Sequence, residues 1–262
     1  GTLWTWGDNL YGQLGDGTLN SVSAPQQVLD NVTAVSAGAN ATAAVRSDGT
    51  LWTWGDNLYG QLGDGTRDSM SAPHQVLADV RFAVMGDYHA AAISTDGTLY
   101  TWGSNLDGQL GTGGLGDTTD EETGAMLQLT PTAVSLPAAV SNVTVGAGHT
   151  AAILSDGTLW TWGSNQEGQL GAETQETGVD REGNQVAVSG TSLAVLEDVR
   201  SVAAGGDFTV ALKTDGTLWA WGGNDYGQLG NGTVVSAAQP VQVLDQVTAV
   251  SAGDYHVAAI RA

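Results

Sequence analysis

One segment of the chain, GTLWTWGDNLYGQLGDGT, occupies residues 1–18 and recurs without a change at residues 49–66. Weaker copies follow it, so that repeat units start near residues 1, 49, 97, 157 and 216. A fixed period of this length is typical of repeat proteins, in which each unit buries its apolar faces against its neighbours. The repeat therefore predicts one domain, residues 1–262, built from five copies of a single unit.

Each unit contains four short segments with the composition of β-strands. In the first unit they are VTAV at 32–35, TAAVR at 42–46, TLWTW at 50–54 and a short strand around 27–29. Asp-Gly and Gly-Asp turns separate these segments, and no window shows a helical period. Units of this length with four antiparallel strands are typical of β-propeller blades. We therefore predict an all-β fold, a β-propeller of five four-stranded blades.

The spacing of the copies also predicts how the two ends of the chain meet. The five periods add up to 263 residues, against 262 present. The chain begins with the third strand of a unit and ends after the second. We therefore expect the strand at 2–6 to pair beside the strand at 256–260, in a blade shared by the two ends.

The full repeat has the form V-x-x-V-x-x-G-x-x-H-T-x-A-L-x-x-D-G-x-L-x-x-W-G-x-N-x-x-G-Q-L-G and resembles the regulator of chromosome condensation repeat in its bacterial variety. Familiar members of that family have seven blades, so the alternative is that this chain is part of a larger, seven-bladed ring. A plant photoreceptor of the family uses Trp and Arg in loops that here read Asp87-Tyr88 and Asp254-Tyr255, so photoreception is not expected. A secreted relative binds β-lactamases through aromatic and acidic residues on one face, which is the nearest chemical match.

Composition and motifs exclude several functions. Seven basic residues against 28 acidic ones give a net charge of −21, which disfavours binding to nucleic acid. No apolar stretch reaches the roughly 18 residues that a membrane span needs, so no membrane insertion is expected. The chain has no cysteine, and it carries no nucleophile, metal or nucleotide-binding motif. We therefore expect no enzyme activity, no catalytic residues, no cofactor and no metal.

Strand alternation predicts which end of the blades does the binding. Successive connections of a meander alternate between the two ends of a sheet, so the G-x-x-H loops, the GQLG loops and the insertions share one end. Variable residues on such loops are candidates for partner binding. Five of them are predicted to contact a partner: Asp87, Tyr88, Asp207, Asp254 and Tyr255. Tyr11, Tyr59 and Tyr226 are expected near the same rim.

Two units carry extra residues after GQLG, and both insertions are acidic. Asp120, Glu121 and Glu122 in the third unit are predicted to attract a basic partner. A solvated acidic loop and a Ca²⁺ site are the alternatives for this run, although the D-x-D-x-D-G pattern is missing.

Residues repeated in every unit are expected to build the fold. The Trp pairs, such as Trp4/Trp6 and Trp52/Trp54, are predicted to pack between blades, and His89, His149 and His256 are predicted to be structural. The sequence thus predicts a non-enzymatic module that binds a protein partner, for which a basic protein is the candidate, through an acidic Tyr/Asp loop face. The alternative is a spacer propeller in a larger extracellular or surface protein, and the expected location is extracellular or at the cell surface.

Overall fold

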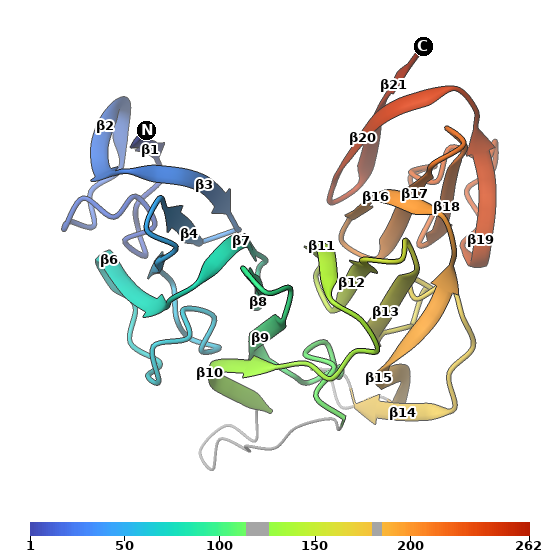
Figure 1. Ribbon diagram of the computed structural model, residues 1–262, viewed down its shortest axis with the longest axis horizontal. Helices are drawn as coiled ribbons and strands as arrows, with labels where there is room; N and C mark the ends of the chain where they lie inside the picture. Colours follow the sequence, from blue (N-terminus) through green and yellow to red (C-terminus); the bar gives the residue numbers. More distant parts are fainter. Residues whose placement is uncertain (114–125, 180–184) are drawn as a thin grey trace. The chain divides into compact units, whose positions relative to one another are not determined.

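The structure is a computed structural model and describes residues 1–113, 126–179 and 185–262 (Figure 1). All regular secondary structure in these ranges is β-strand. The search for membrane-spanning helices in the same ranges finds none. The chain divides into two compact units, of which the first contains strands β1–β10 and the second contains β11–β21 together with the loop that begins at Asn105.

The first unit contains one half-blade and two complete blades. The half-blade pairs β1 (Thr2–Gly7) with β2 (Val22–Asp30). The next blade consists of β3 (Val32–Ala37), β4 (Ala41–Arg46), β5 (Leu51–Gly55) and β6 (Met70–Leu77). The following blade consists of β7 (Val80–Met85), β8 (His89–Ser94), β9 (Leu99–Ser104) and β10 (Leu127–Ala133). Within each complete blade the strands are antiparallel neighbours in chain order.

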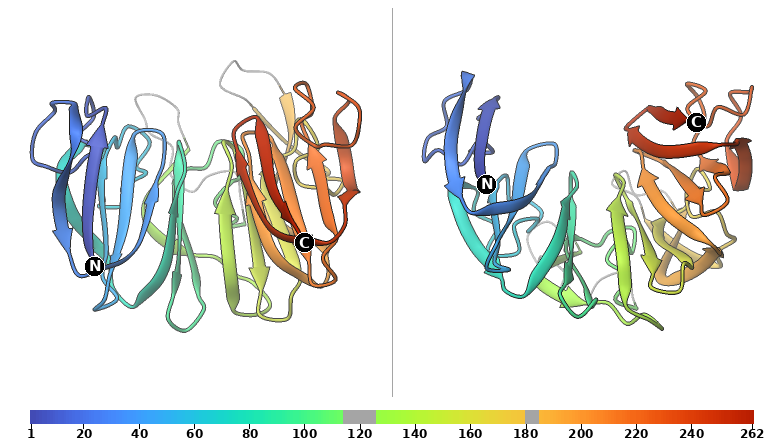
Figure 2. Two further views of the ribbon diagram at one scale, coloured as in Figure 1. Left: turned by 90° about the horizontal axis from the view of Figure 1, so that it is seen from above. Right: turned by 45° about the horizontal axis from the view of Figure 1, so that its top comes forward.

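The second unit has two complete blades and a second half-blade. Its first blade consists of β11 (Val140–Val145), β12 (His149–Leu154), β13 (Leu159–Ser164), β14 (Glu176–Val179) and β15 (Gln185–Leu196). The next consists of β16 (Val199–Ala204), β17 (Phe208–Lys213), β18 (Leu218–Gly222) and β19 (Ala237–Leu244). The half-blade pairs β20 (Val247–Gly253) with β21 (His256–Arg261), and Figure 2 shows these two strands side by side. The all-β, propeller-blade fold predicted from the sequence is confirmed.

The second strand of each complete blade is its most buried element. All six residues of β8, HAAAIS, are buried, and β12 has the same pattern. Small alanine side chains let neighbouring blades approach these strands closely. At the far end of the strand, the Ser-Asp-Gly turn is held by the Asp side chain. In the first complete blade Asp48 Oδ1 accepts hydrogen bonds from the backbone N–H and the hydroxyl of Thr50, at 3.0 and 2.6 Å.

A buried tryptophan joins each complete blade to the long loop that precedes it in the chain. Trp54, Trp102, Trp162 and Trp221 are fully buried. Each indole Nε1 donates a hydrogen bond to a glutamine main-chain oxygen of the preceding long loop, at 2.8–2.9 Å; the acceptors are Gln13, Gln61, Gln109 and Gln169. The structural role predicted for the second Trp of each pair is therefore confirmed at these positions.

The glycine that ends the GQLG motif makes room for that indole. Gly171 has φ +70°, and a Cβ atom placed there would lie 2.6 Å from the Trp221 Nε1 atom. Its counterparts at residues 15, 63 and 111 show the same approach. Both the left-handed backbone and the contact with the ring require glycine at this position.

The two end strands of the chain belong to different units. Within its own unit β1 is paired with β2, and β21 is paired with β20. The expected pairing of 2–6 with 256–260 would join the two units and stays a prediction. Within the first unit Trp4 and Trp6 are 48% and 59% exposed, unlike the fully buried Trp54.

The insertion in the fourth copy adds a strand that the sequence did not predict. β14 pairs with β15, which extends this blade to five strands. The prediction of a single domain over residues 1–262 stays a prediction.

Candidate protein-binding surface

The long loop between the third and fourth strands of each blade is built around one buried asparagine. In the first complete blade Asn57 is fully buried. Its Oδ1 accepts a hydrogen bond from the backbone N–H of Leu62, at 3.0 Å, and its Nδ2 donates to the main-chain oxygens of Thr66 and Asp68, at 3.1 and 3.2 Å. Asn9 and Asn224 make the corresponding contacts in their own loops. The loops are therefore held in place by internal hydrogen bonds.

One residue in each long loop, which we call the tip residue, precedes the glycine of GQLG. Its backbone N–H donates to the side-chain Oε1 of the GQLG glutamine at 2.8–2.9 Å in all five copies. The tip residues are Tyr11, Tyr59, Asp107, Glu167 and Tyr226. This bond fixes the backbone of the tip residue, whatever side chain it carries.

Each tip residue has a counterpart in the G-x-x-H loop that follows it along the chain. The counterparts, two positions after the loop glycine, are Asn40, Tyr88, Gly148, Asp207 and Tyr255. The rings of Tyr59 and Tyr88 pack edge to face, with centroids 5.1 Å apart and an interplanar angle of 82°. Tyr226 and Tyr255 pack in the same way, at 5.3 Å and 69°. The expectation that Tyr59 and Tyr226 lie near the predicted site residues is confirmed.

The two tyrosine pairs differ in how much of them a partner could reach. Tyr226 and Tyr255 are 74% and 62% exposed, whereas Tyr59 and Tyr88 are both half-buried. A pair of rings that pack on each other while staying exposed offers a large contact area with little conformational freedom to lose on binding.

In the fourth copy acidic residues replace the tyrosines: the tip residue is Glu167, and its counterpart is Asp207. Burial around the carboxyl group, and then the nearby Glu167 carboxylate, raise the pKa of Asp207 above its ordinary value, although much of the residue's surface is exposed. Gln169 Nε2 donates to Asp207 at 3.5 Å, and the Ser236 hydroxyl donates to Glu167 at 2.9 Å. A cation that binds between or beside these two carboxylates would stabilise both in their charged form.

Backbone hydrogen bonds join the G-x-x-H loops of the second unit to one another. The N–H of Ala147 donates to the Gly206 oxygen at 3.0 Å, and the N–H of Gly206 donates to the Asp254 oxygen at 3.1 Å. Asp207 and the exposed Asp254 are therefore carried by neighbouring, connected loops. In the first unit Asp87 is also exposed, next to Tyr88.

A cleft of about 510 Å³ opens beside Glu167. Its walls are the long loop at 165–168, residues 172–175 of the insertion, Ala187 of β15, and Ser236 and Ala238. The sequence analysis missed this cleft. The available signal was the extra length after GQLG in the fourth copy, since the insertion forms one wall.

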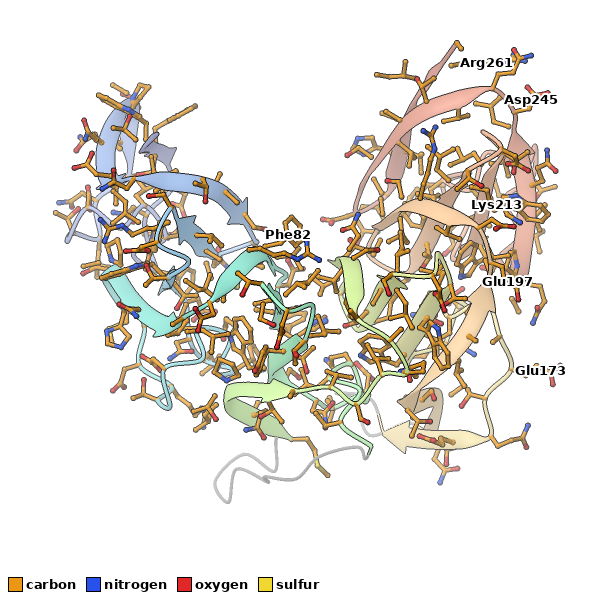
Figure 3. All side chains as sticks on the ribbon, in the orientation of Figure 1. Phe82, Glu173, Glu197, Lys213, Asp245 and Arg261 are labelled. Atoms are coloured by element: carbon orange, nitrogen blue, oxygen red, sulfur yellow. The ribbon has the colours of Figure 1, made fainter. Side chains whose placement is uncertain are left out.

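In the second unit the described Arg and Lys residues all lie at the turn end of the blades, together with acidic residues such as Glu197, Asp215 and Asp245. The basic residues that the structure describes there, Arg200, Lys213 and Arg261, all stand at strand ends beside the tight turns. Arg261 pairs with Asp245, with Nη2 2.7 Å from Oδ1 (Figure 3). The opposite end carries Glu167, Glu173, Asp207, Asp225 and Asp254 and, among the residues described there, no Arg or Lys.

Three of the predicted contact residues, Asp120, Glu121 and Glu122, lie outside the described residues. Within the described ranges no three His, Asp or Glu side chains gather as a metal site would require.

Two of the three repeated histidines are fully buried. His149 Nε2 lies 2.9 Å from the Thr209 hydroxyl, and burial lowers the pKa of His149 to about 4, so the ring is neutral at pH 7. His89 is also fully buried, whereas His256 in the terminal half-blade is exposed. Burial at residues 89 and 149 agrees with the structural role predicted for them.

Four-stranded blades joined by a Trp-to-Gln contact define a β-propeller repeat protein. The model of the regulator of chromosome condensation (RCC1) repeat matches residues 1–45, 48–93, 96–153, 156–212 and 215–260, and the chain belongs to this family.

Among the curated relatives, the chain is 34% identical over 122 residues to the RCC1 domain-containing protein RUG3, mitochondrial, of Arabidopsis thaliana, covering 45% of this chain and 27% of the relative. It is 32% identical over 155 residues to the ultraviolet-B receptor UVR8 of the same plant, covering 56% and 32%. The chain thus spans a third or less of the length of these curated relatives.

Solved structures show the same fold at lower identity. Yeast RCC1 (Prp20), solved bound to Kap60, matches with a TM-score of 0.82 at 22% identity, over 97% of this chain and 61% of that one. Human WBSCR16 matches with a TM-score of 0.79 at 22% identity, over 98% and 66%.

Proposed function

We propose that this chain is a non-enzymatic protein-binding module and that its partner binds at the loop end of the second unit. The observation that carries the proposal is the exposed Tyr226–Tyr255 pair, whose rings pack on each other and whose tip backbone is fixed by Gln228. Exposed, preorganised aromatic side chains are the residues that most often dominate the energy of protein interfaces.

The negative charge at the loop end of the second unit favours a partner with a basic surface. The loop end of the second unit presents Glu167, Asp207 and Asp254, while the described Arg and Lys residues of this unit lie at the opposite end. A partner surface rich in Lys or Arg would be attracted to this end and oriented by it.

Relatives with solved structures support a binding role at the level of the family. Yeast RCC1 was solved bound to Kap60, and a second structure of the same yeast protein was described with its binding properties to Gsp1p and histones. These likenesses support protein binding in general and do not specify the partner of this chain.

The partner can be identified by site-specific photo-crosslinking. A photoreactive phenylalanine analogue at position 255 should capture the partner, and the same analogue at position 245, at the turn end, serves as the matched control. Asp245 is exposed, so both positions can reach a bound protein. Equal capture from both positions, or capture from position 245 alone, would place the interface elsewhere.

Affinity for the captured partner then tests the residues. Tyr226→Ala and Tyr255→Ala should each weaken binding by about 30-fold, corresponding to about 2 kcal/mol for an interface anchor. Asp207→Asn and Asp254→Asn should mainly lower the association rate and its dependence on salt. Asp245→Asn should leave both quantities unchanged. Normal affinity in both tyrosine variants would refute the proposed surface.

A further inference from the structure

The cleft beside Glu167 forms because the long loop of the fourth copy takes a different course from the others. In the second copy Asn57 Nδ2 donates to main-chain oxygens nine and eleven residues further along the loop, and the matching asparagines of the first and fifth copies do the same. In the fourth copy Asn165 Nδ2 instead donates to the Ala172 oxygen, at 3.0 Å. The chain beyond Ala172 therefore does not return to the asparagine, and both segments line a cleft of about 510 Å³.

Asn165 has a hydrogen-bond donor left for a bound molecule. A side-chain amide has two N–H groups, and within the described ranges Nδ2 of Asn165 has one acceptor, the Ala172 oxygen. The residue is held in place, because its Oδ1 accepts the backbone N–H of Leu170 at 3.1 Å and its own backbone N–H donates to the Ala187 oxygen at 2.8 Å. Since Asn165 lines the cleft, its second N–H can be donated to a carbonyl oxygen of a molecule bound there.

Two carboxylates line the cleft from different segments of the chain. Glu167 is the tip residue of the long loop, and its Oε2 accepts the hydroxyl of Ser236 at 2.9 Å. Glu173 lies on the insertion, where it is exposed (Figure 3). Among the described residues that line the cleft there is no Arg or Lys. A cation that enters the cleft would therefore meet two carboxylates and no positive side chain from the lining.

Small residues leave room between these polar groups. Gly168, Ala172, Ala187 and Ala238 all line the cleft. Gly168 has φ +81°, and a Cβ atom placed there would lie 2.5 Å from the Cα atom of Ala238, so the loop packs directly against β19. A volume of about 510 Å³ is in the usual range of ligand sites. The cleft can therefore hold a side chain together with the main chain that carries it.

We propose that this cleft binds a peptide segment that contains an arginine, with the guanidinium at Glu167 and Glu173 and a main-chain oxygen of the segment at Asn165 Nδ2. A guanidinium has five N–H donors in a planar fork, so it can bond to carboxylates from two segments at once. A lysine ammonium is a more strongly hydrated point charge, which favours arginine in a cleft that is open to water. The inference rests on the proposed function, since the cleft lies at the loop end assigned to the partner, and it specifies the chemistry that the partner presents there.

Binding of short peptides to this chain tests the proposal. The probes are acetyl-Gly-Arg-Gly-amide and the same peptide with citrulline, which has nearly the shape of arginine but no charge. In an NMR titration the arginine peptide should shift the backbone amide signals of residues 165–168 and 172–175. Citrulline should weaken binding at least about 10-fold, as expected when a charged hydrogen bond is lost. The corresponding lysine peptide should also bind more weakly than the arginine peptide.

Variants of the two carboxylates test the residues. Glu173→Gln and Glu167→Gln should each weaken binding of the arginine peptide, and in the double variant the arginine and citrulline peptides should bind alike. Glu173 is exposed, so its variant removes a charge without disturbing the core. Glu197→Gln is the matched control, because Glu197 is an exposed carboxylate at the turn end of the same blade, and it should leave peptide binding unchanged (Figure 3).

Four results would overturn the proposal. They are no shift at residues 165–168 and 172–175 at millimolar peptide, equal binding of the arginine and citrulline peptides, equal binding of the arginine and lysine peptides, and a preference for arginine that survives in the double variant. The crosslinking experiment is independent of these results. Capture from position 255 without peptide binding in the cleft would refute this inference alone, whereas peptide binding in the cleft without capture from position 255 would support it and refute the proposed tyrosine surface.

Discussion

Replacing Trp54 by Ala tests the junction that joins the blades. The side chain is fully buried, packs against Leu3 and Ala44, and donates to the Gln13 oxygen at 2.9 Å. Removing a buried Trp leaves a cavity that typically costs about 3–5 kcal/mol. The lost hydrogen bond adds little, because the Gln13 oxygen also accepts the hydroxyl of Thr42 at 2.8 Å and so keeps a partner.

Thermal and urea unfolding followed by circular dichroism measure this loss. For a domain of this size it corresponds to a fall in Tm on the order of 10 °C. Trp4→Ala is the control, since Trp4 is 48% exposed and bonds only within its own strand, and its cost should stay below about 1 kcal/mol. Equal stability of the Trp54 and Trp4 variants would refute the view that the second Trp of each repeat holds neighbouring blades together.

Three further changes probe the loops and the buried histidine. Asn57→Ala should cost about 1–3 kcal/mol in denaturant unfolding, since the backbone N–H of the buried Leu62 loses its acceptor and two further backbone bonds of the loop are lost, and a loss below about 1 kcal/mol would show that the long loop does not depend on Asn57. His149 has its pKa lowered to about 4 in the folded chain, so the unfolded chain takes up a proton first as the pH falls. Stability should therefore drop by about 3 kcal/mol between roughly pH 6.5 and 4, and His149→Phe, the residue type that Phe208 supplies at the same repeat position, should flatten this drop in pH-dependent unfolding. Glu167→Gln should lower the pKa of Asp207, followed by NMR titration of the carboxyl carbon; an unchanged pKa would mean that burial alone raises it.

The repeat pattern predicts most strands of the blade, because these strands are determined by residue types and turns that lie close together in the sequence. The strands around 42–46 and 50–54 follow from β-branched and aromatic residues between Asp-Gly turns, and the structure places β4 and β5 there. The burial of Trp54 follows from repetition, because a residue needed at every junction recurs in every copy.

Features that depend on two different copies are harder to predict. Tyr59 and Tyr88 come from different blades, and only the offset between a long loop and the next G-x-x-H loop brings their rings together. β14 could not be found by comparison with the other units, because three of the five lack an insertion and the insertion of the third copy has a different sequence.

The glutamine of GQLG makes the contacts that stabilise the fold without using the side chain of the tip residue, which is the side chain a partner would contact. Its main-chain oxygen receives the next blade's indole, and its side-chain oxygen receives the backbone N–H of the tip residue, so neither contact involves the tip side chain. Tyr, Asp and Glu all occur at the tip position within this one chain, with the same backbone hydrogen bond. Side chains at the tip positions can therefore be exchanged to change which partner binds, while the contacts between blade and loop stay intact.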